Sequence, residues 1–411
     1  MNMSGTRYVL SLNGGSSSLK FALFAAHGSV NQEPILSGQI GRIGEASSEA
    51  RLFRQGAPVN DTLCPAAITD HGAALRQILA WVEYDFLAPA TRQALTGVGH
   101  RVVHGGTRYT TAQVIDEAVI KGVEACTALA PLHNPINLEL IRSVREALPT
   151  VPQVAVFDTA FFHDLPAHAA QYALPAELVA RFGIRRFGFH GISHQYVCRQ
   201  ASERLGLPDR PARLISLHLG SGSSIAAVRG ERCVDTSMGM TPLEGLVMGT
   251  RCGDIDPGVA LFLAQKSKLS VEKIDHLLNH ESGLKGLCGS ADMREVRSRA
   301  TNGDADAQQA LALYRYRMTK YIGAYFLALG GVDALIFTGG IGEHDTRLRA
   351  EVVESLSPLG IRLDAAKNTQ SGQAMIEIHS PDSTAKILVI PTREEWEIAR
   401  QSLAALDQKN Q

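Results

Sequence analysis

The chain has 411 residues, of which 45% are hydrophobic and 20% are charged, and its formal net charge is −1. This length predicts about two or three domains, and the composition is that of an ordinary globular protein. The near-neutral charge offers no basic footprint for nucleic acid or an anionic membrane, so an anionic substrate needs local cations.

The six cysteines are scattered along the chain and form no C-x-x-C pair. Such sparse cysteines argue against a disulfide framework and predict reduced thiols in a cytoplasmic protein. The N-terminus enters the first apolar run with no signal core, and no apolar stretch approaches the roughly 18 residues of a spanning helix. We therefore expect a cytoplasmic protein with neither a membrane nor a nucleic acid as partner.

Short apolar runs alternate with helical patterns along the whole chain, which predicts an α/β protein with a mixed sheet flanked by helices in each lobe. The predicted strands are Tyr8–Leu12, Leu19–Phe24, Val98–Val103, Val154–Phe157, Leu214–Leu219, Ile225–Val228, Ala334–Phe337 and Ile387–Ile390. The predicted helices are Ala73–Val82, Ile136–Leu148, His194–Leu205, Pro257–Lys266, Ala305–Leu329 and one that starts at Glu394. The polar, turn-rich stretch Ser29–Asp61 is expected to form a peripheral excursion.

Two segments half a chain apart are similar, because in each an apolar strand runs into a glycine-serine loop. They are Arg7–Leu19 and Arg213–Ile225. Glycines at such turns let the backbone approach a ligand, and successive N–H groups can form an anion-binding nest. The repeat predicts two topologically similar lobes that close on a polyphosphate, as in a kinase.

Three glycine loops are candidate phosphate or nucleotide contacts. Asn13–Lys20 is not the P-loop motif, but its amides and hydroxyls could hold phosphate oxygens, with Lys20 as the neutralising charge and Asn13 near a metal-bound water. Gly220–Ser224 follows a buried-looking strand, and Phe337–Glu343 ends a strand and precedes a helix. Each loop alone could be a tight turn, but three together favour a nucleotide site.

The stretch Gly99–Gly106 supplies candidate substrate contacts. Arg101 and Val103 are two residues apart, so a strand places them on one face. A cation beside an apolar wall suits a small carboxylate with a short alkyl tail, since guanidinium pairs with carboxylate. A strand with one exposed arginine is the alternative. Asp158 ends another apolar run, where it is either a functional carboxylate or a helix cap.

Two glycine-flanked polar clusters, Gly188–His194 and Gly249–Pro257, could direct His190 and Arg251 at a developing phosphoryl charge. The H-x-x-x-H pairs do not predict zinc. On a strand, His100 and His104 would lie about 13 Å apart, too far to share one ion. His190 and His194 could meet only on a helix.

The sequence blocks together resemble the acetokinase family, within the actin/sugar-kinase/heat-shock ATPase superfamily. The blocks are NGGSSSLKF, GHRVVHGG, APLHNP, VFDTAF, FGFHGISH, HLGSGSS, RCGDIDP, FTGGIGE and IPTREE, in the family's order from about Tyr8 to Arg400. The resemblance implies two duplicated actin-like, ribonuclease-H-like lobes. Their expected bounds are 1–157 with 394–411, for the acyl substrate and first phosphate loop, and 158–393, for the nucleotide and dimerisation.

The resemblance also implies a function: reversible, ATP- and Mg²⁺-dependent phosphorylation of acetate to acetyl phosphate by a homodimer, with Mn²⁺ as another usable metal. Asp158, His190 and Arg251 resemble the family's catalytic residues. Arg101, Val103, Leu132, Phe189 and Pro242 resemble the acyl-substrate site. Asn13 and Glu394 resemble the metal-associated pair, although Glu395 is adjacent. The ATP/ADP contacts would be Lys20, Ser16, Ser18, His218, Leu219, Gly220, Ser221, Gly222, Asp292, Met293, Arg294, Gly339, Gly340, Ile341, Gly342, Glu343 and His344.

Three residues depart from the family pattern, and we expect all three on or near the nucleotide side. The family usually has asparagine at the positions of Ser221, His344 and Arg393. Nucleotide affinity or donor choice is therefore the property expected to differ, whereas the carboxylate side keeps the pattern.

The implied reaction needs no general base, because a carboxylic acid with a pKa of about 4.3 is already ionised at pH 7. We expect direct in-line transfer, with cations offsetting the repulsion between carboxylate and phosphoryl oxygens. Propionate or another short-chain fatty acid is the alternative substrate. An ATP-gated chaperone-like module and a non-catalytic ATP-binding regulatory homologue are alternatives of a different class.

Overall fold

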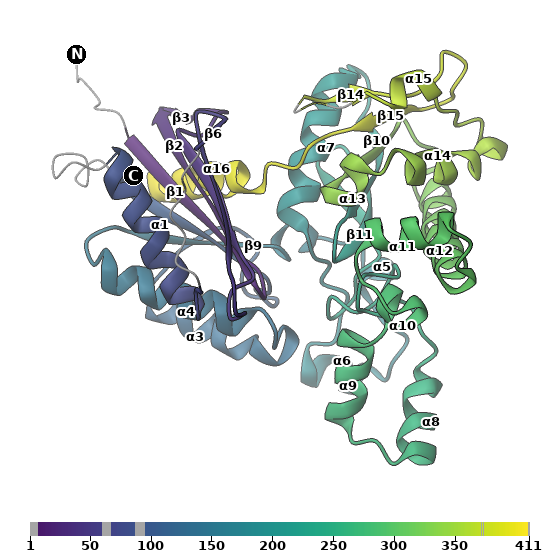
Figure 1. Ribbon diagram of the computed structural model, residues 1–411, viewed down its shortest axis with the longest axis horizontal. Helices are drawn as coiled ribbons and strands as arrows, with labels where there is room; N and C mark the ends of the chain where they lie inside the picture. The colour runs from purple at the N-terminus through teal and green to yellow at the C-terminus, as the bar shows by residue number, and fades with distance from the viewer. Residues whose placement is uncertain (1–6, 60–66, 87–94, 371, 373, 410–411) are drawn as a thin grey trace. The chain divides into compact units, whose positions relative to one another are not determined.

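The computed structural model describes residues 7–59, 67–86, 95–370, 372 and 374–409, and the chain divides into two compact units (Figure 1). Unit 1 comprises Met1–His163 and Arg393–Gln411, and unit 2 comprises Asp164–Thr392. The expected boundaries differ from these at residues 158–163 and at Arg393, all of which lie in unit 1. Asp158 directly follows a strand of unit 1 and pairs with Arg101 there. Among the described helices, none is long and apolar enough to cross a membrane.

Unit 1 contains one large mixed sheet. Its strands are β1 (Arg7–Gly14), β2 (Ser18–His27), β3 (Ser29–Val30), β4 (Leu36–Gly41), β5 (Glu49–Arg54), β6 (Ala57–Pro58), β7 (Leu95–Val102), β8 (Gln113–Val114) and β9 (Gln153–Phe157). Its helices are α1 (His71–Phe86), α3 (Glu117–Ala125), η1 (Thr127–Leu129), α4 (Asn134–Ala147), η2 (Ala160–Phe162) and α16 (Glu394–Lys409).

The stretch Ser29–Asp61 was predicted to be a peripheral excursion, and this is wrong for its described part. The strand order β6-β5-β4-β2-β1-β7-β9-β8 shows that β4 to β6 extend the sheet from β2. On β4, Leu36 and Ile40 are fully buried, while the residues between them are half-buried. A strand with few apolar positions is hard to distinguish from a polar loop by sequence alone.

Helices cover both faces of the unit 1 sheet (Figure 1). Along β1, Leu10 and Leu12 join a buried cluster with side chains of α1 and α4. Val9, which precedes Leu10 and so points to the opposite face, packs instead with Ala399 and Leu403 of α16. The C-terminal helix is therefore an integral layer of unit 1, and its first residues lie against the sheet.

Unit 2 contains a second mixed sheet. Its strands are β10 (Arg213–Leu219), β11 (Ser223–Arg229), β12 (Arg232–Thr236), β13 (Ala334–Thr338), β14 (Ile376–Glu377) and β15 (Lys386–Val389). Its helices are α5 (Ala167–Ala170), α6 (Ala176–Phe182), α7 (Gly191–Leu205), α8 (Pro257–Ser267), α9 (Val271–His280), α10 (Gly283–Cys288), α11 (Met293–Thr301), α12 (Ala305–Leu329), α13 (Gly339–His344), α14 (Thr346–Glu354), η3 (Ser357–Leu359) and α15 (Ala365–Asn368).

The two sheets repeat one topology. The order β12-β11-β10-β13-β15-β14 in unit 2 matches β4-β2-β1-β7-β9-β8 in unit 1. In both, a first hairpin is antiparallel, the next two strands are parallel to its first strand, and the last short strand is antiparallel. The duplication predicted from the paired loops is confirmed.

Helix α12 shows how sequence signals set the elements of unit 2. It spans 25 residues, as predicted, from the N-cap Asp304, whose side chain accepts from the Ala307 N–H. It ends at Gly330, which adopts a left-handed conformation at the C-cap. Its buried side chains, including Tyr314 and Ile322, form the main core of unit 2 with β10 and β13. This core fixes the strand ends from which the glycine loops emerge.

Candidate active site

A buried ion pair lies at the carboxyl ends of two neighbouring parallel strands in unit 1. Arg101, near the end of β7, donates from Nε and Nη2 to Asp158 Oδ2, at 3.0 and 2.6 Å. Asp158 directly follows β9 and its side chain is fully buried, while 14% of the Arg101 side chain is exposed. The structure therefore joins these two predicted residues and directs the Asp158 carboxylate at the arginine.

Asn13 connects this pair to the start of α16. The third donor of Arg101, Nη1, contacts Asn13 Oδ1 at 3.2 Å. The Asn13 amide nitrogen donates to Glu394 Oε2 at 3.0 Å and to Glu395 Oε1 at 3.1 Å. Asn13 ends β1, so three adjacent strand ends and the first turn of α16 form one polar cluster. We call Asn13, Arg101, Asp158, Glu394 and Glu395 the carboxylate-site cluster.

The charge balance of the carboxylate-site cluster keeps its arginine protonated. Burial alone would lower the pKa of Arg101, but the carboxylates of Asp158 and Glu394 raise it above its ordinary value. Three carboxylates lie around one guanidinium, so the cluster carries an excess of negative charge that a further cation would neutralise. No group of three acidic, histidine or cysteine residues among the described part of the chain converges as a complete metal site.

Two of the predicted acyl-pocket residues, Val103 and Leu132, belong to unit 1. Val103 lies one residue beyond the end of β7, so the strand predicted through Val103 ends one residue earlier. Its N–H donates to Asn137 Oδ1 at 3.1 Å, and its side chain is 2% exposed. Leu132, in the turn before α4, is 37% exposed. Phe189 and Pro242 belong to unit 2.

The first glycine loop joins β1 to β2, as predicted. Asn13 lies directly opposite Lys20 in the hairpin register. Ser16 and Lys20 are exposed, Ser18 is half-buried, and the Gly15 N–H donates to the Ser18 carbonyl at 2.8 Å. The loop therefore presents hydroxyl groups and one ammonium group beside the residue that contacts Arg101.

In unit 2, His190 begins α7 in a left-handed backbone conformation with φ of 55°. Such a conformation is uncommon for a residue with a side chain and often marks a functional position. Its Nδ1 hydrogen-bonds the Ser224 hydroxyl at 2.9 Å, and its ring stacks on His218 with centroids 4.3 Å apart. His194 bonds the same hydroxyl through Nε2 at 2.8 Å. Burial and the nearby His218 hold the pKa of His194 well below its ordinary value.

The side chains of His190 and Arg251 both lie beside the backbone of the second glycine loop. A Cβ added to Gly222 would lie 3.3 Å from His190 Nε2 and 3.5 Å from Arg251 Nη1, so both groups lie beside this backbone. Arg251 Nη1 donates to the Pro242 carbonyl at 2.9 Å. Glycine at position 222 leaves room for both side chains, and the structure gathers the two predicted phosphoryl contacts within unit 2.

Unit 2 also holds a cavity of about 800 Å³, a volume suited to a nucleotide. Its lining residues are Gly220, Ser221, Ala291, Asp292, Met293, Arg294, Arg297, Gly340, Ile341, His344, Asp345 and Thr346. Most of these were predicted nucleotide contacts. Sequence reasoning missed Ala291, Arg297, Asp345 and Thr346, which belong to no glycine motif.

Six of the nucleotide contacts predicted in unit 2 lie outside this cavity wall. They are His218, Leu219, Gly222, Gly339, Gly342 and Glu343. Leu219 is fully buried, and His218 Nδ1 bonds the Ser193 hydroxyl at 2.8 Å. Gly339 has φ of 76°, and a Cβ there would approach the Leu219 carbonyl to 2.7 Å. This glycine therefore serves the close packing of α13 on β10.

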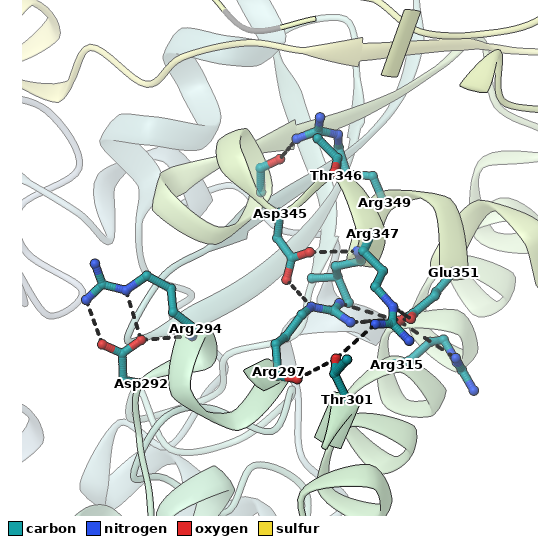
Figure 2. Close-up of polar contacts among 12 residues, drawn as sticks. Asp292, Arg294, Arg297, Thr301, Arg315, Asp345, Thr346, Arg347, Arg349 and Glu351 are labelled. Atoms are coloured by element: carbon teal, nitrogen blue, oxygen red, sulfur yellow. Dashed lines mark hydrogen bonds and ion pairs between the residues drawn. The ribbon is translucent and has the colours of Figure 1, made fainter. Parts of the chain in front are cut away.

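Ion pairs hold together the helices around the cavity, and Arg297 and Asp345 of one such pair themselves line it (Figure 2). Arg297 of α11 donates from Nε to Asp345 Oδ2 at 2.6 Å and from Nη1 to Glu351 at 3.3 Å. Asp345 also caps α14, because its Oδ1 accepts from the Leu348 N–H at 2.8 Å. Arg297 is thus the link between α11 and α14. Only the cap had a local sequence signal.

Arg349 is a further residue that sequence reasoning missed. Its side chain is 1% exposed, and its guanidinium donates to the carbonyls of Gly342, Glu343 and Asn368 and to Asn368 Oδ1, at 2.8 to 3.0 Å. Burial lowers the pKa of Arg349. These bonds hold the end of α13 in place. They therefore fix the part of the cavity wall that Gly340 and Ile341 form.

The structure separates the three departures from the family pattern. Ser221 and His344 line the cavity, as expected. Arg393 does not, because its Nη1 contacts Glu33 Oε1 at 3.0 Å and the Gln32 carbonyl at 3.3 Å in unit 1. Arg393 therefore lies outside the cavity wall, and its partner Glu33 is 360 residues away in sequence.

Comparison with known proteins agrees with this geometry. A sequence model described as the acetokinase family matches residues 8–400. Acetate kinase from Syntrophobacter fumaroxidans is 46% identical over 97% of both chains, and acetate kinase from Leifsonia xyli is 47% identical over 97% of this chain and 98% of its own. Among solved structures, a propionate kinase from Francisella tularensis superposes with a TM-score of 0.87 at 37% identity, over 97% of this chain and 99% of its own. Porphyromonas gingivalis acetate kinase superposes with a TM-score of 0.85 at 40% identity, over 97% of this chain and 100% of its own. The chain belongs to the acetokinase family.

Proposed function

We propose that the protein catalyses the reversible, ATP-dependent phosphorylation of acetate to acetyl phosphate by direct in-line transfer. The observation that carries this proposal is the Arg101–Asp158 pair at the strand ends of unit 1, in which Arg101 precedes the buried Val103 by two residues. It supplies a fixed guanidinium and an apolar side chain for a two-carbon carboxylate. Membership of the acetokinase family supports the same activity.

Arg101 is arranged to bind the substrate carboxylate. A guanidinium has five N–H donors, and three of those in Arg101 contact Asp158 and Asn13. The remaining donors, on Nη1 and Nη2, suit a carboxylate ligand. Asp158 accepts two of the three bonds, so its role is to orient Arg101. Acetate is already ionised at neutral pH and needs no proton removed.

His190 and Arg251 supply hydrogen-bond donors, and Arg251 also positive charge, for the transferring phosphoryl group. Both lie beside the Gly222 backbone, and their side chains are held by Ser224 and Pro242. Preorganised donors of this kind stabilise charge that develops in a transition state. Lys20, at the first loop, adds a further cation for the phosphates.

The cofactors implied are ATP or ADP with Mg²⁺, or with Mn²⁺ in its place. The 800 Å³ cavity of unit 2 suits the nucleotide. The oxygens of Glu394 and Glu395 both lie beside Asn13 and are the hard ligands that Mg²⁺ prefers, with phosphate oxygens and water completing its shell. When bound, the metal supplies charge neutralisation on the phosphates.

The partners proposed are acetate and acetyl phosphate, together with a second copy of the chain. Exposed apolar side chains on two helices of unit 2 support the homodimer: Phe182 of α6 is 59% exposed, and Leu261 and Phe262 of α8 are 65% and 58% exposed. Helix α8 has no buried residue, so a partner surface would explain its apolar sequence. Buried free thiols such as Cys198 and Cys233 support a cytoplasmic location.

The propionate kinase from Francisella tularensis makes propionate the second candidate substrate. The buried Val103 should crowd a longer alkyl chain, and one methylene is worth about 1–3 kcal/mol in such a pocket. We therefore favour acetate.

The test is formation of acetohydroxamate from acetate, ATP, Mg²⁺ and hydroxylamine by the purified protein. We expect product that depends on both acetate and ATP and that is lost in Arg101→Ala. Absence of product in the wild-type protein would contradict the activity and favour a non-catalytic ATP-binding homologue. Retention of configuration at a chiral γ-phosphorus would contradict a single in-line displacement.

A further inference from the structure

Glu343 was expected to contact the nucleotide, but its carboxylate is directed at backbone groups. Its Oε1 accepts from the Gly339 N–H at 2.9 Å and from the Thr392 N–H at 3.0 Å. The Thr338 hydroxyl lies 3.4 Å from the same oxygen. One carboxylate oxygen therefore ties the start of α13, which contributes to the nucleotide cavity, to a residue far along the chain.

Thr392 is the last residue of unit 2 before the chain enters unit 1. Its hydroxyl also bonds the Ser193 hydroxyl at 2.8 Å, which in turn bonds His218. The next residue, Arg393, is held in unit 1 by its ion pair with Glu33. The crossing is thus fixed on both sides of a single peptide bond, and hinges often consist of a few such residues between rigid elements.

The residues after this crossing belong to the carboxylate-site cluster. Glu394 and Glu395 both accept from Asn13, which accepts from Arg101. A continuous series of covalent and hydrogen bonds therefore runs from the nucleotide cavity, through Glu343 and the crossing, to the substrate arginine.

We propose that Glu343 is a positioning residue that couples occupancy of the nucleotide cavity to the crossing at Thr392, and so to the carboxylate-site cluster. The inference rests on the proposed function only in assuming that the cavity takes a nucleotide. A bound nucleotide orders Gly340, Ile341 and His344 on α13, and the Glu343 carboxylate transmits that order to Thr392. A continuous path does not by itself establish coupling, so the test measures the coupling directly.

The chemistry of the contact separates positioning from direct nucleotide or metal binding. All three contacts are made by one oxygen, so Glu343→Gln keeps the acceptor and loses only the charge. Glu343→Ala removes the acceptor and leaves the Gly339 and Thr392 amides without it. A residue that acted by its charge on the metal or phosphates would lose its effect in both variants.

The experiment is hydrogen exchange of the backbone amides of residues 391–395, with and without ADP, in wild type, Glu343→Ala and Glu343→Gln. Exchange reports opening on the minutes-to-hours scale. We expect ADP to slow exchange of this segment in wild type and in Glu343→Gln, but not in Glu343→Ala at an ADP concentration that saturates the cavity. Glu354→Ala, an exposed glutamate of α14 outside this path, should behave as wild type.

Two-substrate kinetics supply a second readout. The factor by which saturating ATP lowers the KM for acetate should fall at least about fivefold in Glu343→Ala, the lower end of typical coupling. It should stay near the wild-type value in Glu343→Gln.

The inference is overturned if ADP leaves the segment unaffected in wild type, if Glu343→Ala retains the ADP effect, or if Glu343→Gln behaves as Glu343→Ala. The exchange measurement needs only ADP binding and no turnover. A protein that shows the exchange effect but forms no acetohydroxamate would therefore contradict the proposed function and leave the coupling intact.

Discussion

The carboxylate-site cluster of unit 1 and the nucleotide cavity of unit 2 are built in different ways. In the first, ionised side chains bond one another directly, and Asp158 is fully buried beneath Arg101. In the second, backbone and short side chains form much of the wall, and ion pairs such as Arg297–Asp345, whose residues also line the cavity, hold its helices together. A change at the cluster alters a buried charge pair, whereas a change on the cavity wall alters one contact among many.

This difference explains where the chain departs from its family. Ser221 and His344, two of the departures that the sequence resemblance implied, line the cavity, and neither belongs to the cluster. Replacing one partner of a buried ion pair leaves an uncompensated charge and costs about 3–5 kcal/mol, whereas most surface substitutions cost within about 0.5 kcal/mol. Substitutions between this chain and its family are therefore expected mainly on the nucleotide side.

The largest effect should come from Arg101→Ala. The substitution removes the substrate contact and leaves Asp158 buried without its guanidinium, so kcat/KM for acetate should fall at least about 10³-fold. Arg142→Ala, an exposed arginine on α4, is the matched control and should keep wild-type kinetics. A folded Arg101→Ala protein that lost less than tenfold in kcat/KM for acetate would contradict the comparison.

A smaller loss, confined to the chemical step, is expected for Arg251→Ala. This arginine lies beside Gly222 and His190. Loss of a transition-state donor should lower kcat at least about 10²-fold with little change in the KM for ATP. A near-wild-type kcat would reject the assigned role.

The smallest effects should come from the cavity wall. Ser221→Asn and His344→Asn restore the usual family residues, and each should change the KM for ATP by no more than about tenfold, within 1.4 kcal/mol. The KM for acetate should not change. If either substitution altered acetate kinetics more than nucleotide kinetics, the division between the two regions would be wrong.

Much of the fold was predictable because its signals are local. Apolar runs and glycine turns marked both hairpins, and the similarity of Arg7–Leu19 to Arg213–Ile225 predicted the duplicated sheets. The strands β4 and β5 were not predicted, because they lie toward one edge of the sheet and bury few side chains. An alternating polar pattern is easily mistaken for a loop there.

The candidate site likewise contains residues that sequence motifs predicted and residues that they did not. Arg101, Asp158 and Asn13 carried motif signals, and the structure brings them together. Arg297 and Arg349 carried none, because their partners come from other helices and from carbonyl groups that only the folded chain gathers. Contacts of this kind depend on tertiary structure and have no short-range pattern.

The central claim is that this protein transfers phosphate from ATP to a two-carbon carboxylate. The most direct measurement is kcat/KM in the hydroxamate assay, with acetate or propionate as acceptor and ATP or pyrophosphate as donor. The account predicts that acetate exceeds propionate by at least about tenfold, the effect of one methylene in a tight pocket, and that ATP is the better donor. A preference for propionate, or faster transfer from pyrophosphate, would contradict it.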